Sequence, residues 1–548
     1  MLLRIFATNE RESMPTLNWI GKDAVIDHHL KVPFHLLRDV PELACGEPGS
    51  GNLIVEGDNL VALKALLPYY AGQVKCIYID PPYNTGNEKW IYNDNVNSPI
   101  IREWLGKVVG PEGDTLDRHD RWLCMMYPRL ALLKEFLRQD GSIWVSMDDS
   151  EIQLLRMLMD EVFGRDRFVA CNIWQKRYSR ENREAIGDSH EYVLVYAMDP
   201  EKFKQTRNKV PLTEEQSKIY KNPNNDPEGR WRGIPMTAQG FRPNQMYEVT
   251  TPSGKVYRPP EGRCWGMIES EYLKLREKGR IYFGKDGSAQ PSVIRYLHEV
   301  NGFVPWTWWP HEEVGHTDEA RKEVQSLFGT QTAFDTPKPT RLIERVLQIA
   351  SNPGDLILDS FAGSGTTGHA MLELNAAKPD EKPRRSILVE IEPRIAKEVT
   401  AERMRKVATG YANKKGADVE SIGGSFRYCQ LGEPLFTEDG KIRDSVTFTD
   451  LARHVFFTET GEPLPNDEVK RSPFLGAVRG VGVYLLFNGI LGDKSANGGN
   501  ILTRKILAEL PAFAGHKVIY CAGCLLGKER LQAERITVRQ TPYEIKVS

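Results

Sequence analysis

The sequence predicts an α/β fold built on a doubly wound sheet, and three observations support this prediction. From Asn52 onward, short apolar runs alternate with segments whose apolar residues recur at helical spacing, which is the pattern of strands connected by helices. Glycines stand between a strand pattern and a helix pattern at Gly363 and Gly365, the position at which such sheets bind ligands. Between residues 201 and 335 the alternation is lost and then resumes, which predicts an insert within the sheet-forming domain.

Length and composition indicate a protein of several domains. The 548 residues are 40% hydrophobic and 27% charged, an ordinary composition for a globular protein. We expect an extension at 1–50, a sheet-forming domain in two parts at 51–200 and 336–435, an insert at 201–335 and a smaller α/β region at 440–548. No apolar run reaches the about 18 residues of a membrane span, and no secretory leader pattern is visible, so we expect a cytoplasmic protein without membrane contact.

Net charge and the positions of the cysteines restrict the kinds of nucleic-acid and metal sites that we expect. A net charge of −2 provides no general attraction to nucleic acid, so any such binding requires a local basic surface. The eight cysteines are scattered, and only Cys521 and Cys524 form a C-x-x-C pair. Because no second pair and no histidine pair stand beside them, we expect reduced core residues and no metal site.

Strands are predicted where short apolar runs lie between turn residues: 52–56, 74–79, 142–146, 192–196, 356–358 and 386–389, then 483–487, 517–521 and 536–540 in the C-terminal region. Helices are predicted where apolar residues fall on one stripe: 60–67, 120–138, 152–163, 340–350 and 393–407, with one more opened by the glycine loop. Capping residues support two helix starts. Asn59 is expected to cap the helix at 60–67, and the acidic stretch 148–151 precedes the helix at 152–163.

The first chemical motif is Asp80-Pro81-Pro82-Tyr83, which follows the buried strand at 74–79. Two prolines fix φ and remove two backbone donors, so the loop is rigid and its carbonyls are free to accept hydrogen bonds. A carboxylate, an open carbonyl and an aromatic ring together suit a flat base with an exocyclic amine. The alternative is a plain turn at a strand end, since Pro-Pro is also common turn chemistry.

The second motif runs from Asp359 through Gly365 and lies between the strand ending at Leu358 and a helix. Glycines there let backbone N–H groups approach a ligand and direct the helix N-terminus at it, which indicates a nucleotide-like cofactor. The alternative is a tight turn that needs glycine only for packing. Glu390 ends the next strand, where a carboxylate can accept from ribose hydroxyls; Glu392 is the rival position.

Together the two motifs resemble the β class of amino DNA methyltransferases. The resemblance spans about residues 52 to 410 and rests on the order Gly57-Asp58, Asp80 to Tyr83, a variable insert, Phe334 to Pro339, and Phe361-x-Gly363-x-Gly365. The Asp80 motif, Trp122 through Arg129 and the block Asp140 to Asp149 are similar in particular to the modification subunit of type III restriction-modification systems. The resemblance implies a permuted S-adenosylmethionine-dependent methyltransferase sheet.

The resemblance also implies roles in methyl transfer from S-adenosylmethionine to N6 of adenine in DNA. Asp80 and the Pro81 carbonyl would accept hydrogen bonds from the adenine amine, and Tyr83 would stack on the flipped base, with Pro82 completing the rigid loop. The residues implied to bind the cofactor are Asp58, Thr336, Lys338, Asp359, Phe361, Gly363, Gly365 and Glu390. For Asp58, capping of the following helix explains an Asp-Asn pair about as well.

The insert is expected to recognise the DNA sequence, because basic residues alternate there with aromatic ones. The candidates for DNA contact are Arg230, Arg232, Arg242 and Arg263, with Trp231, Tyr247, Tyr257 and Trp265 among the interleaved rings. For any single residue, a solvated charge or a core ring is the alternative. The C-terminal region matches no catalytic motif and suggests a protein partner, such as a restriction or helicase subunit; a homodimer is the other partner considered.

Other functions stay open at this point. Transfer to N4 of cytosine uses the same chemistry, although Asp80, where the cytosine enzymes more typically have Ser, favours adenine by resemblance. A DNA-recognition subunit of a larger restriction or defence complex would use the insert without its own catalysis. A nicotinamide-linked oxidoreductase would leave the Asp80 motif without a role.

Overall fold

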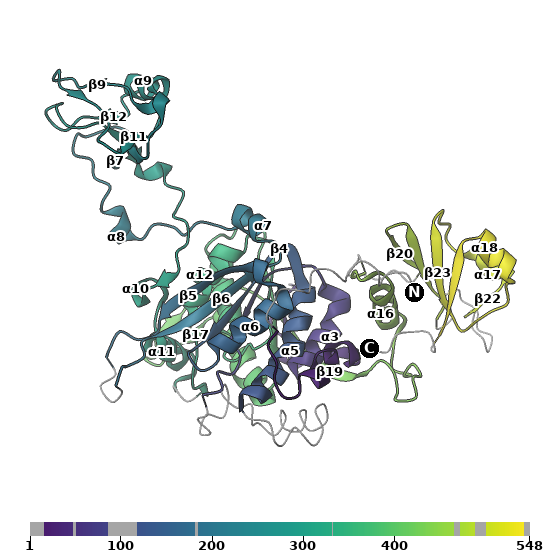
Figure 1. Cartoon of the computed structure of the whole chain (residues 1–548). Helices are drawn as coiled ribbons and strands as arrows, with labels where there is room; N and C mark the ends of the chain where they lie inside the picture. The colour runs from purple at the N-terminus through teal and green to yellow at the C-terminus, as the bar shows by residue number, and fades with distance from the viewer. Residues whose placement is uncertain are drawn as a thin grey trace. The chain divides into compact units, whose positions relative to one another are not determined.

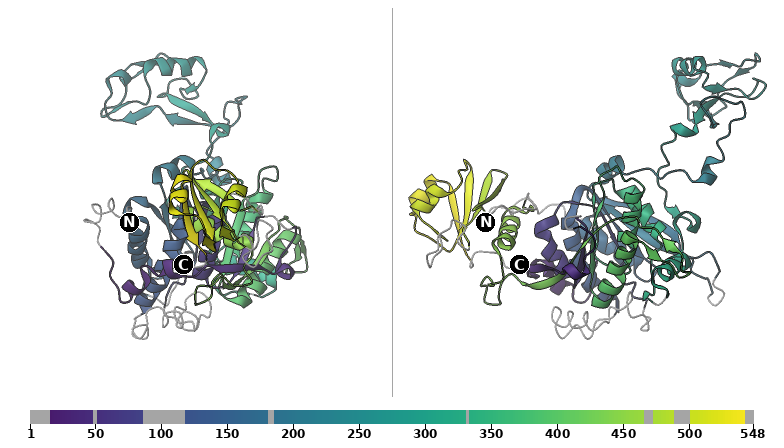
Figure 2. Two further views of the ribbon diagram at one scale, coloured as in Figure 1. Left: turned by 90° about the vertical axis from the view of Figure 1, so that its right-hand side faces the viewer. Right: turned by 180° about the vertical axis from the view of Figure 1, so that it is seen from behind.

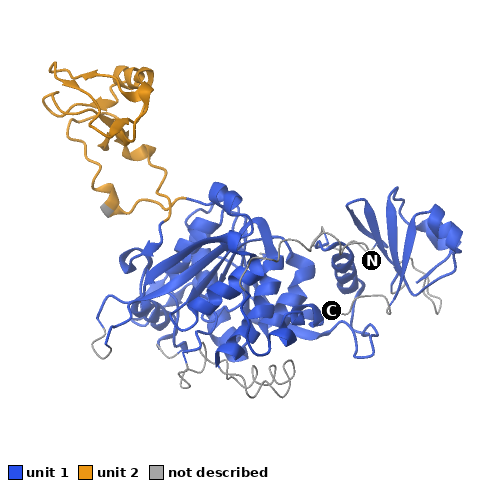
Figure 3. Ribbon diagram, viewed as in Figure 1, with its two compact units in different colours: residues 1–208, 306–548 blue, residues 209–305 orange. Residues whose placement is uncertain are grey.

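The structure is a computed structural model that describes residues 16–47, 51–85, 118–180, 185–330, 333–464, 472–487 and 500–541. The chain forms two compact units (Figure 3). Unit 1 combines residues 1–208 with 306–548, and unit 2 consists of residues 209–305. The insert expected at 201–335 therefore contains unit 2, while residues 201–208 and 306–335 of that range lie in unit 1.

Unit 1 is built on one ten-stranded sheet (Figure 1). In spatial order its strands are β1 (His35–Asp39), β19 (Arg427–Pro434), β2 (Leu53–Glu56), β16 (Arg385–Glu390), β15 (Leu356–Asp359), β3 (Val74–Ile79), β4 (Leu137–Met147), β6 (His190–Ala197), β5 (Phe168–Gln175) and β14 (Trp308–Trp309). The strands from β19 to β4 are parallel, whereas β6 is antiparallel to both β4 and β5.

Helices cover both faces of this sheet, which confirms the predicted doubly wound α/β fold (Figures 1 and 2). One layer contains α3 (Asn59–Tyr70), α5 (Arg118–Phe136) and α6 (Ile152–Phe163), which pack in that order. The other contains α12 (Thr340–Ala350), α13 (Thr366–Ala376) and α15 (Glu402–Thr409). Among the described residues of this part, the further α-helices are α1 (Lys22–Val25), α2 (His28–Lys31), α7 (Pro200–Thr206), α10 (His311–Val314), α11 (Thr317–Phe328) and α14 (Pro393–Ile395).

Strands β15 and β3 are neighbours in the sheet although they lie far apart in the sequence. From this pair the sheet extends through β16 and β2 on one side and through β4 on the other. In open α/β sheets, ligands bind beyond the carboxyl ends of strands at such a switch point. The permuted order of the chain therefore places the ends of the β3 and β15 motifs at one edge.

Most predicted elements agree with the structure to within a few residues, but both capping predictions are wrong. No side-chain hydrogen bond caps the start of α6, so the acidic stretch 148–151 does not act as predicted. Asp58 and not Asn59 caps α3, because Asp58 Oδ1 accepts from the backbone N–H groups of Leu60 at 2.9 Å and Val61 at 3.2 Å. Asn59 is the first helical residue, and its side-chain amide donates instead to the Ser360 carbonyl at 3.0 Å. Asp and Asn are both preferred at the N-cap, so the sequence alone did not show which of the two residues precedes the helix. The hydrogen bond from Asn59 to Ser360 accounts for the observed choice.

Unit 2 has a small core of its own. Its elements are α8 (Glu214–Ser217), β7 (Trp231–Pro235), β8 (Thr237–Gln239), β9 (Val249–Thr250), β10 (Val256–Tyr257), β11 (Arg263–Trp265), α9 (Glu269–Glu277), β12 (Ile281–Tyr282) and β13 (Ser292–Tyr296). Trp265 is fully buried and packs with Met236, Val249 and Tyr272. Several aromatic residues of the insert thus build its core, as a unit of under a hundred residues requires.

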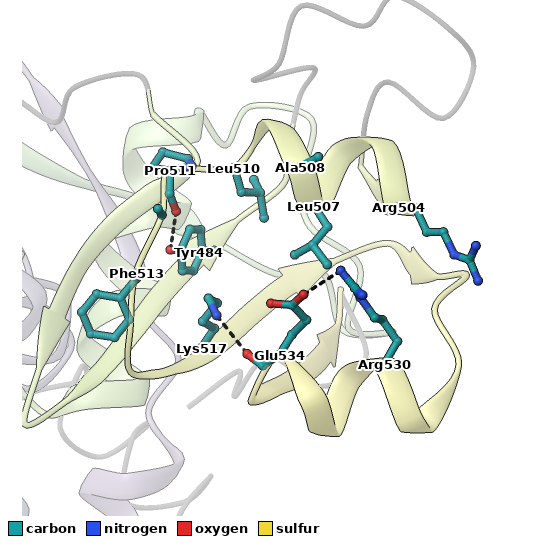
Figure 4. Close-up of a pocket in the computed structure, with 11 residues that line it drawn as sticks. Tyr484, Arg504, Leu507, Ala508, Leu510, Pro511, Phe513, Lys517, Arg530 and Glu534 are labelled. Atoms are coloured by element: carbon teal, nitrogen blue, oxygen red, sulfur yellow. Dashed lines mark hydrogen bonds and ion pairs between the residues drawn. The ribbon is translucent and has the colours of Figure 1, made fainter.

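The C-terminal region begins with α16 (Phe448–Thr460), which packs on α3. A four-stranded sheet follows in the order β20 (Phe474–Val478), β21 (Val481–Leu485), β23 (His516–Cys521) and β25 (Ile536–Gln540), with α17 (Arg504–Glu509) and α18 (Lys528–Ala533). A cavity of about 590 Å³ lies beside both helices, and Figure 4 shows Arg530 paired with Glu534 at its rim. No predicted site residue lines it.

Within the described ranges, no helix combines the length and the apolar character that crossing a membrane requires.

Candidate functional site

Three acidic residues from distant parts of the chain lie at the carboxyl ends of neighbouring parallel strands. Asp80 follows β3, Asp359 ends β15 and Glu390 ends β16. A narrow cavity of about 20 Å³ lies between the first two. Six of the predicted site residues line it: Asp80, Thr336, Lys338, Asp359, Phe361 and Gly363. The structure thus brings both sequence motifs into one site.

The glycine loop after β15 is held by hydrogen bonds that the Asp359 carboxylate accepts. Asp359 Oδ1 accepts from the Phe361 N–H at 3.0 Å, and its Oδ2 accepts from the Thr367 hydroxyl at 2.5 Å. Gly363 and Gly365 have φ of 50° and 76°, in the left-handed region that favours glycine. A Cβ on Gly365 would also lie only 3.2 Å from the Thr400 carbonyl. The loop therefore needs glycine for conformation as well as for close packing.

Asp359 is almost completely buried, and this burial raises its pKa to about 7. The hydrogen bonds from Thr367 and Phe361 act in the opposite direction, since they stabilise the charged form. A carboxyl group with such a pKa changes its charge readily near neutral pH. A cation bound in the adjacent cavity would favour the carboxylate.

Glu390 is buried and contacts the glycine loop directly. Its Oε2 accepts from the Gly363 N–H at 2.8 Å, and its Oε1 accepts from the Glu392 N–H at 2.9 Å. Glu392 itself is half-buried. Asp58, in turn, caps α3 and pairs with Arg129 at 3.1 Å. Neither Glu390 nor Asp58 lines the small cavity, and among the described residues only Glu390 of the two has a hydrogen bond to a residue that does, Gly363.

Of the Asp80 loop, Asp80 lines the cavity, whereas Pro81, Pro82 and Tyr83 do not. Asp80 Oδ2 is paired with Lys338 Nζ at 2.7 Å, while the buried Oδ1 accepts no hydrogen bond from any described residue. Burial raises the pKa of Asp80, and the Lys338 ammonium opposes that shift. The Trp122 indole donates to the Pro82 carbonyl at 2.7 Å, whereas no described donor is found for the Pro81 carbonyl. The orphaned oxygen and the open carbonyl are the acceptors that a planar amine requires.

Two residues of this site escaped the sequence reasoning. Glu191 on β6 accepts from the Tyr83 hydroxyl at 3.0 Å, and its Oε2 lies 3.6 Å from Lys338 Nζ. Lys176 lies 3.5 Å from the other Glu191 oxygen. For Glu191, the only signal in the sequence is an acidic residue at the start of an apolar strand. Acidic residues are also common at exposed strand ends.

A buried arginine donates hydrogen bonds to hydroxyl groups in and beside the glycine loop. Arg403 on α15 is fully buried, and its guanidinium donates to the hydroxyls of Ser364, Thr366 and Thr340 at 3.3, 3.0 and 3.0 Å. Its carboxylate partner is Glu323 at 3.4 Å. Arg403 thereby ties the N-terminus of α12 to the N-terminus of α13.

We expect Arg403→Met to lower the free energy of unfolding by about 3 kcal/mol, because the change leaves Glu323 and three hydroxyls without their buried partner. Urea denaturation measures this loss. Arg341→Met is the control: it removes a pair with Glu319 at 2.6 Å whose arginine is 41% exposed, so we expect a loss below about 1 kcal/mol. Equal losses in the two variants would contradict the supporting role of Arg403.

The four arginines predicted to contact DNA divide into two pairs. Arg230 and Arg242 are exposed on unit 2. Arg232 and Arg263 are half-buried: the first lies over the Tyr220 ring, 5.2 Å from its centroid, and the second donates to the Thr237 carbonyl at 3.2 Å. Exposure therefore favours the first pair for contact with a ligand.

Among the described residues, no group of three or more His, Cys, Asp or Glu side chains is arranged so that it could hold a metal ion. Cys521 and Cys524 are free thiols on β23 and on the short strand β24 (Gly523–Cys524).

Comparison with known proteins gives consistent matches. The family model described as DNA methylase matches residues 74–402. The Mod subunit of the type III restriction-modification enzyme StyLTI from Salmonella typhimurium is 32% identical over 475 residues, which cover 81% of this chain and 70% of that protein. The EcoPI Mod subunit from Escherichia phage P1 is 32% identical and the EcoP15I Mod subunit from Escherichia coli is 28% identical. The matches cover 68% of this chain in both cases, and 64% and 65% of those two relatives, slightly under two thirds of their length.

Solved structures also match. The cytosine-N4-specific PvuII DNA methyltransferase is 13% identical, with 65% of this chain and 86% of that chain covered and a TM-score of 0.33. The complex of M1.HpyAVI with SAM is 15% identical, with 64% and 98% covered and a TM-score of 0.28.

Proposed function

The chain belongs to the DNA methylase family, and on this premise we propose that it is a site-specific DNA methyltransferase that transfers a methyl group from S-adenosylmethionine to N6 of adenine. One observation carries the proposal. The buried Asp80 Oδ1 has no hydrogen-bond partner among the described residues, and Asp80 lines the same cavity as the glycine loop. An acceptor for an amine thus lies beside a loop suited to a nucleotide-like cofactor.

The chemistry at the amine follows from the two open acceptors. An adenine amine is a weak nucleophile because its lone pair is delocalised into the ring. Hydrogen bonds from its two N–H groups to Asp80 and to the Pro81 carbonyl favour a pyramidal nitrogen and stabilise the positive charge that develops on it. The base must first leave the duplex, and the Tyr83 ring offsets part of that cost by stacking.

The cofactor site fits a cationic methyl donor. When bound, S-adenosylmethionine supplies a methyl group on a positively charged sulfur. Asp359 and the N–H groups of the glycine loop are proposed to hold its polar groups, with Phe361 and Gly363 lining the same cavity. Glu390 acts at the ribose end, Thr336 and Lys338 close the opposite wall, and Asp58 and Gly365 support the loop margins.

We expect cofactor binding to weaken at low pH. Burial raises the pKa of Asp359 to about 7, and a bound cation favours its carboxylate, so binding expels the proton. Between pH 8 and pH 6 the Kd of S-adenosylmethionine should rise about tenfold, as isothermal titration can measure. Without the cofactor, the pKa of Asp359 in the folded chain is higher than its usual value of 3.8. Protonation of Asp359 therefore stabilises the folded state at low pH, and this stabilisation is lost as the pH rises through about 7.

Asp359→Asn is the control for that experiment, because an amide does not titrate. Its Kd should be higher than that of the wild type at pH 8 and independent of pH between 6 and 8. A wild-type Kd that does not change over this range would show that Asp359 does not titrate against the cofactor.

The proposed activity is tested by incubating the chain with duplex DNA and labelled S-adenosylmethionine and then digesting the DNA to nucleosides. Label in N6-methyladenine supports the proposal. Label in N4-methylcytosine would keep the reaction and change the base, and absence of label in DNA would overturn it.

Unit 2 is proposed as the part that recognises the DNA sequence. It is a separate compact unit whose sequence is inserted between the two halves of the catalytic domain, and Arg230 and Arg242 are exposed on it. Arginine suits both phosphate contacts and guanine edges. Arg232 and Arg263 are proposed to support the same surface through their packing.

Protein partners are proposed from the relatives. Three of them are Mod subunits of type III restriction-modification enzymes, so we propose that this chain methylates DNA within a restriction-modification system and associates with a restriction subunit. The C-terminal region is the proposed contact, because no methylation motif falls in it. A second copy of the chain is the other proposed partner, and sedimentation of the purified chain measures that association.

A further inference from the structure

Charged side chains beside the Asp80 loop alternate in sign. Asp188 pairs with Lys176 at 2.8 Å, and Lys176 Nζ lies 3.5 Å from Glu191 Oε1. Lys338 Nζ then lies 3.6 Å from Glu191 Oε2 and 2.7 Å from Asp80 Oδ2. The side chains of Glu191, Lys338 and Asp80 are only 12%, 9% and 12% exposed. Lys338 is therefore a buried cation placed between two carboxylates.

The ion pair between Lys338 and Asp80 conflicts with the role proposed for Asp80 in methyl transfer. A carboxylate that is paired with an ammonium group at 2.7 Å has much of its charge neutralised. Such a carboxylate gives less stabilisation to the positive charge that develops on the adenine amine. Asp80 acts at full strength only when the ammonium of Lys338 has moved away from it.

Glu191 is placed to receive that ammonium. The Lys338 carbonyl accepts from the Thr366 hydroxyl at 3.3 Å, so the backbone is fixed and rotation within the side chain exchanges the two partners. The Lys338 ammonium also lies over the Tyr83 ring, 4.8 Å from its centroid. A buried ammonium without a partner would be costly, and Glu191 removes that cost.

Resting on the proposed function, we propose that Glu191 is a positioning residue for methyl transfer. As the target amine takes its place at Asp80, the Lys338 ammonium moves to Glu191, and the Asp80 carboxylate is left free to accept from the amine. Glu191 also fixes the ring that stacks on the base, because it accepts from the Tyr83 hydroxyl at 3.0 Å.

The surroundings of Glu191 keep it ready for this exchange. Burial acts to raise its pKa, but Lys338 and Lys176 outweigh burial, so the pKa of Glu191 is lowered. Burial instead dominates at Asp80 and raises the pKa of that carboxyl. Of the two carboxylates that share Lys338, Glu191 thus holds its charge more firmly.

The first test is Glu191→Gln. An amide cannot replace the lost charge, so Lys338 stays at Asp80, and we expect kcat to fall about tenfold to a hundredfold. Glu191 does not line the cofactor cavity, so the Kd of S-adenosylmethionine should change less than about threefold. Glu191→Asp keeps the charge and should recover part of the lost kcat. An unchanged kcat in Glu191→Gln would overturn the proposal.

The control for a loss of stability is Glu161→Gln. Glu161 is 17% exposed and pairs with Lys22 at 2.7 Å, so it matches Glu191 in burial and in partner but lies on α6 outside the site. We expect its kcat to stay within about twofold of the wild-type value. Thermal unfolding of both variants separates a folding defect from a kinetic one.

The decisive test combines Glu191→Gln with Lys338→Met. Lys338→Met alone leaves two neighbouring buried carboxylates, which raises the pKa of Asp80 further and lowers kcat. In the double variant neither the competing cation nor the second carboxylate remains, so Lys338 no longer holds Asp80. At saturating S-adenosylmethionine, its single-turnover rate should exceed that of each single variant.

A double variant slower than both single variants would show that Lys338 does not compete with the amine, and the proposal would fail. This outcome is distinct from failure of the proposed function, because that failure would leave the wild type itself without transfer of label to DNA. If Glu191→Gln does not fold, Glu191→Ala takes its place in the single and double variants.

Discussion

Asp80→Ala is expected to reduce methyl transfer by at least about 10³-fold, because it removes the acceptor that stabilises positive charge on the amine. The cavity places this carboxylate beside the glycine loop, and its Oδ1 is the orphaned acceptor. The Pro81 carbonyl remains, but a neutral carbonyl alone offsets little of a developing charge. The loss should appear in kcat, since the interaction strengthens in the transition state.

The measurement is transfer of labelled methyl groups to duplex DNA, with S-adenosylmethionine binding measured on the same preparation. Binding should stay within about threefold of the wild-type value, because Asp359 and the glycine loop are unchanged. Asp148→Ala is a matched control: Asp148 directly follows β4, the neighbour of β3, and does not line the cavity. Retained transfer in Asp80→Ala would refute the assignment of the site.

The sequence predicted the fold and the pairing of the two motifs because both depend on local patterns. Asp80 and Asp359 each follow an apolar run that reads as a buried strand. Parallel strands of a doubly wound sheet end at one edge, so residues at those ends meet there however far apart they lie in the chain. The strands β3 and β15 are adjacent, as this argument requires.

Other parts of the site left no such signal. Arg403 lies within a helical pattern, and nothing local distinguishes a buried arginine from a solvated one. Its hydrogen-bond partners Ser364 and Thr340 come from two other segments, so only the tertiary structure identifies them. Glu191 is hidden for the same reason, since its partner Lys338 lies across the inserted unit in the sequence.

The aromatic residues of the insert show a further limit of composition. Trp265 is fully buried and Trp231 is nearly so, and both belong to cores within unit 2. A small unit must bury large side chains in its own core, whether or not it binds DNA. Composition alone therefore indicates a separate folding unit more firmly than it indicates which rings touch a ligand.

We expect that unit 2 can be removed with little disturbance to unit 1. Val210 and Phe303 form an antiparallel bridge near its two ends, so both connections run side by side there. On the side of unit 1, Asn208 donates to the Ile349 carbonyl at 2.9 Å, and the Thr307 carbonyl accepts from Ile173 at 2.7 Å. Both cut ends are thus anchored in unit 1, and a flexible linker of about ten residues can join them.

Replacing residues 209–305 by such a linker is expected to leave S-adenosylmethionine binding within about threefold, because every residue that lines the small cavity belongs to unit 1. Discrimination between DNA with and without the recognition site should fall by at least about 10³-fold, since only non-specific binding to the backbone remains. Methylation-sensitive sequencing of DNA treated with the full chain identifies the site, and competition binding with site-containing and scrambled duplexes then measures the ratio. Sequence-specific methylation by the shortened chain would place recognition in unit 1 and contradict the role proposed for Arg230 and Arg242.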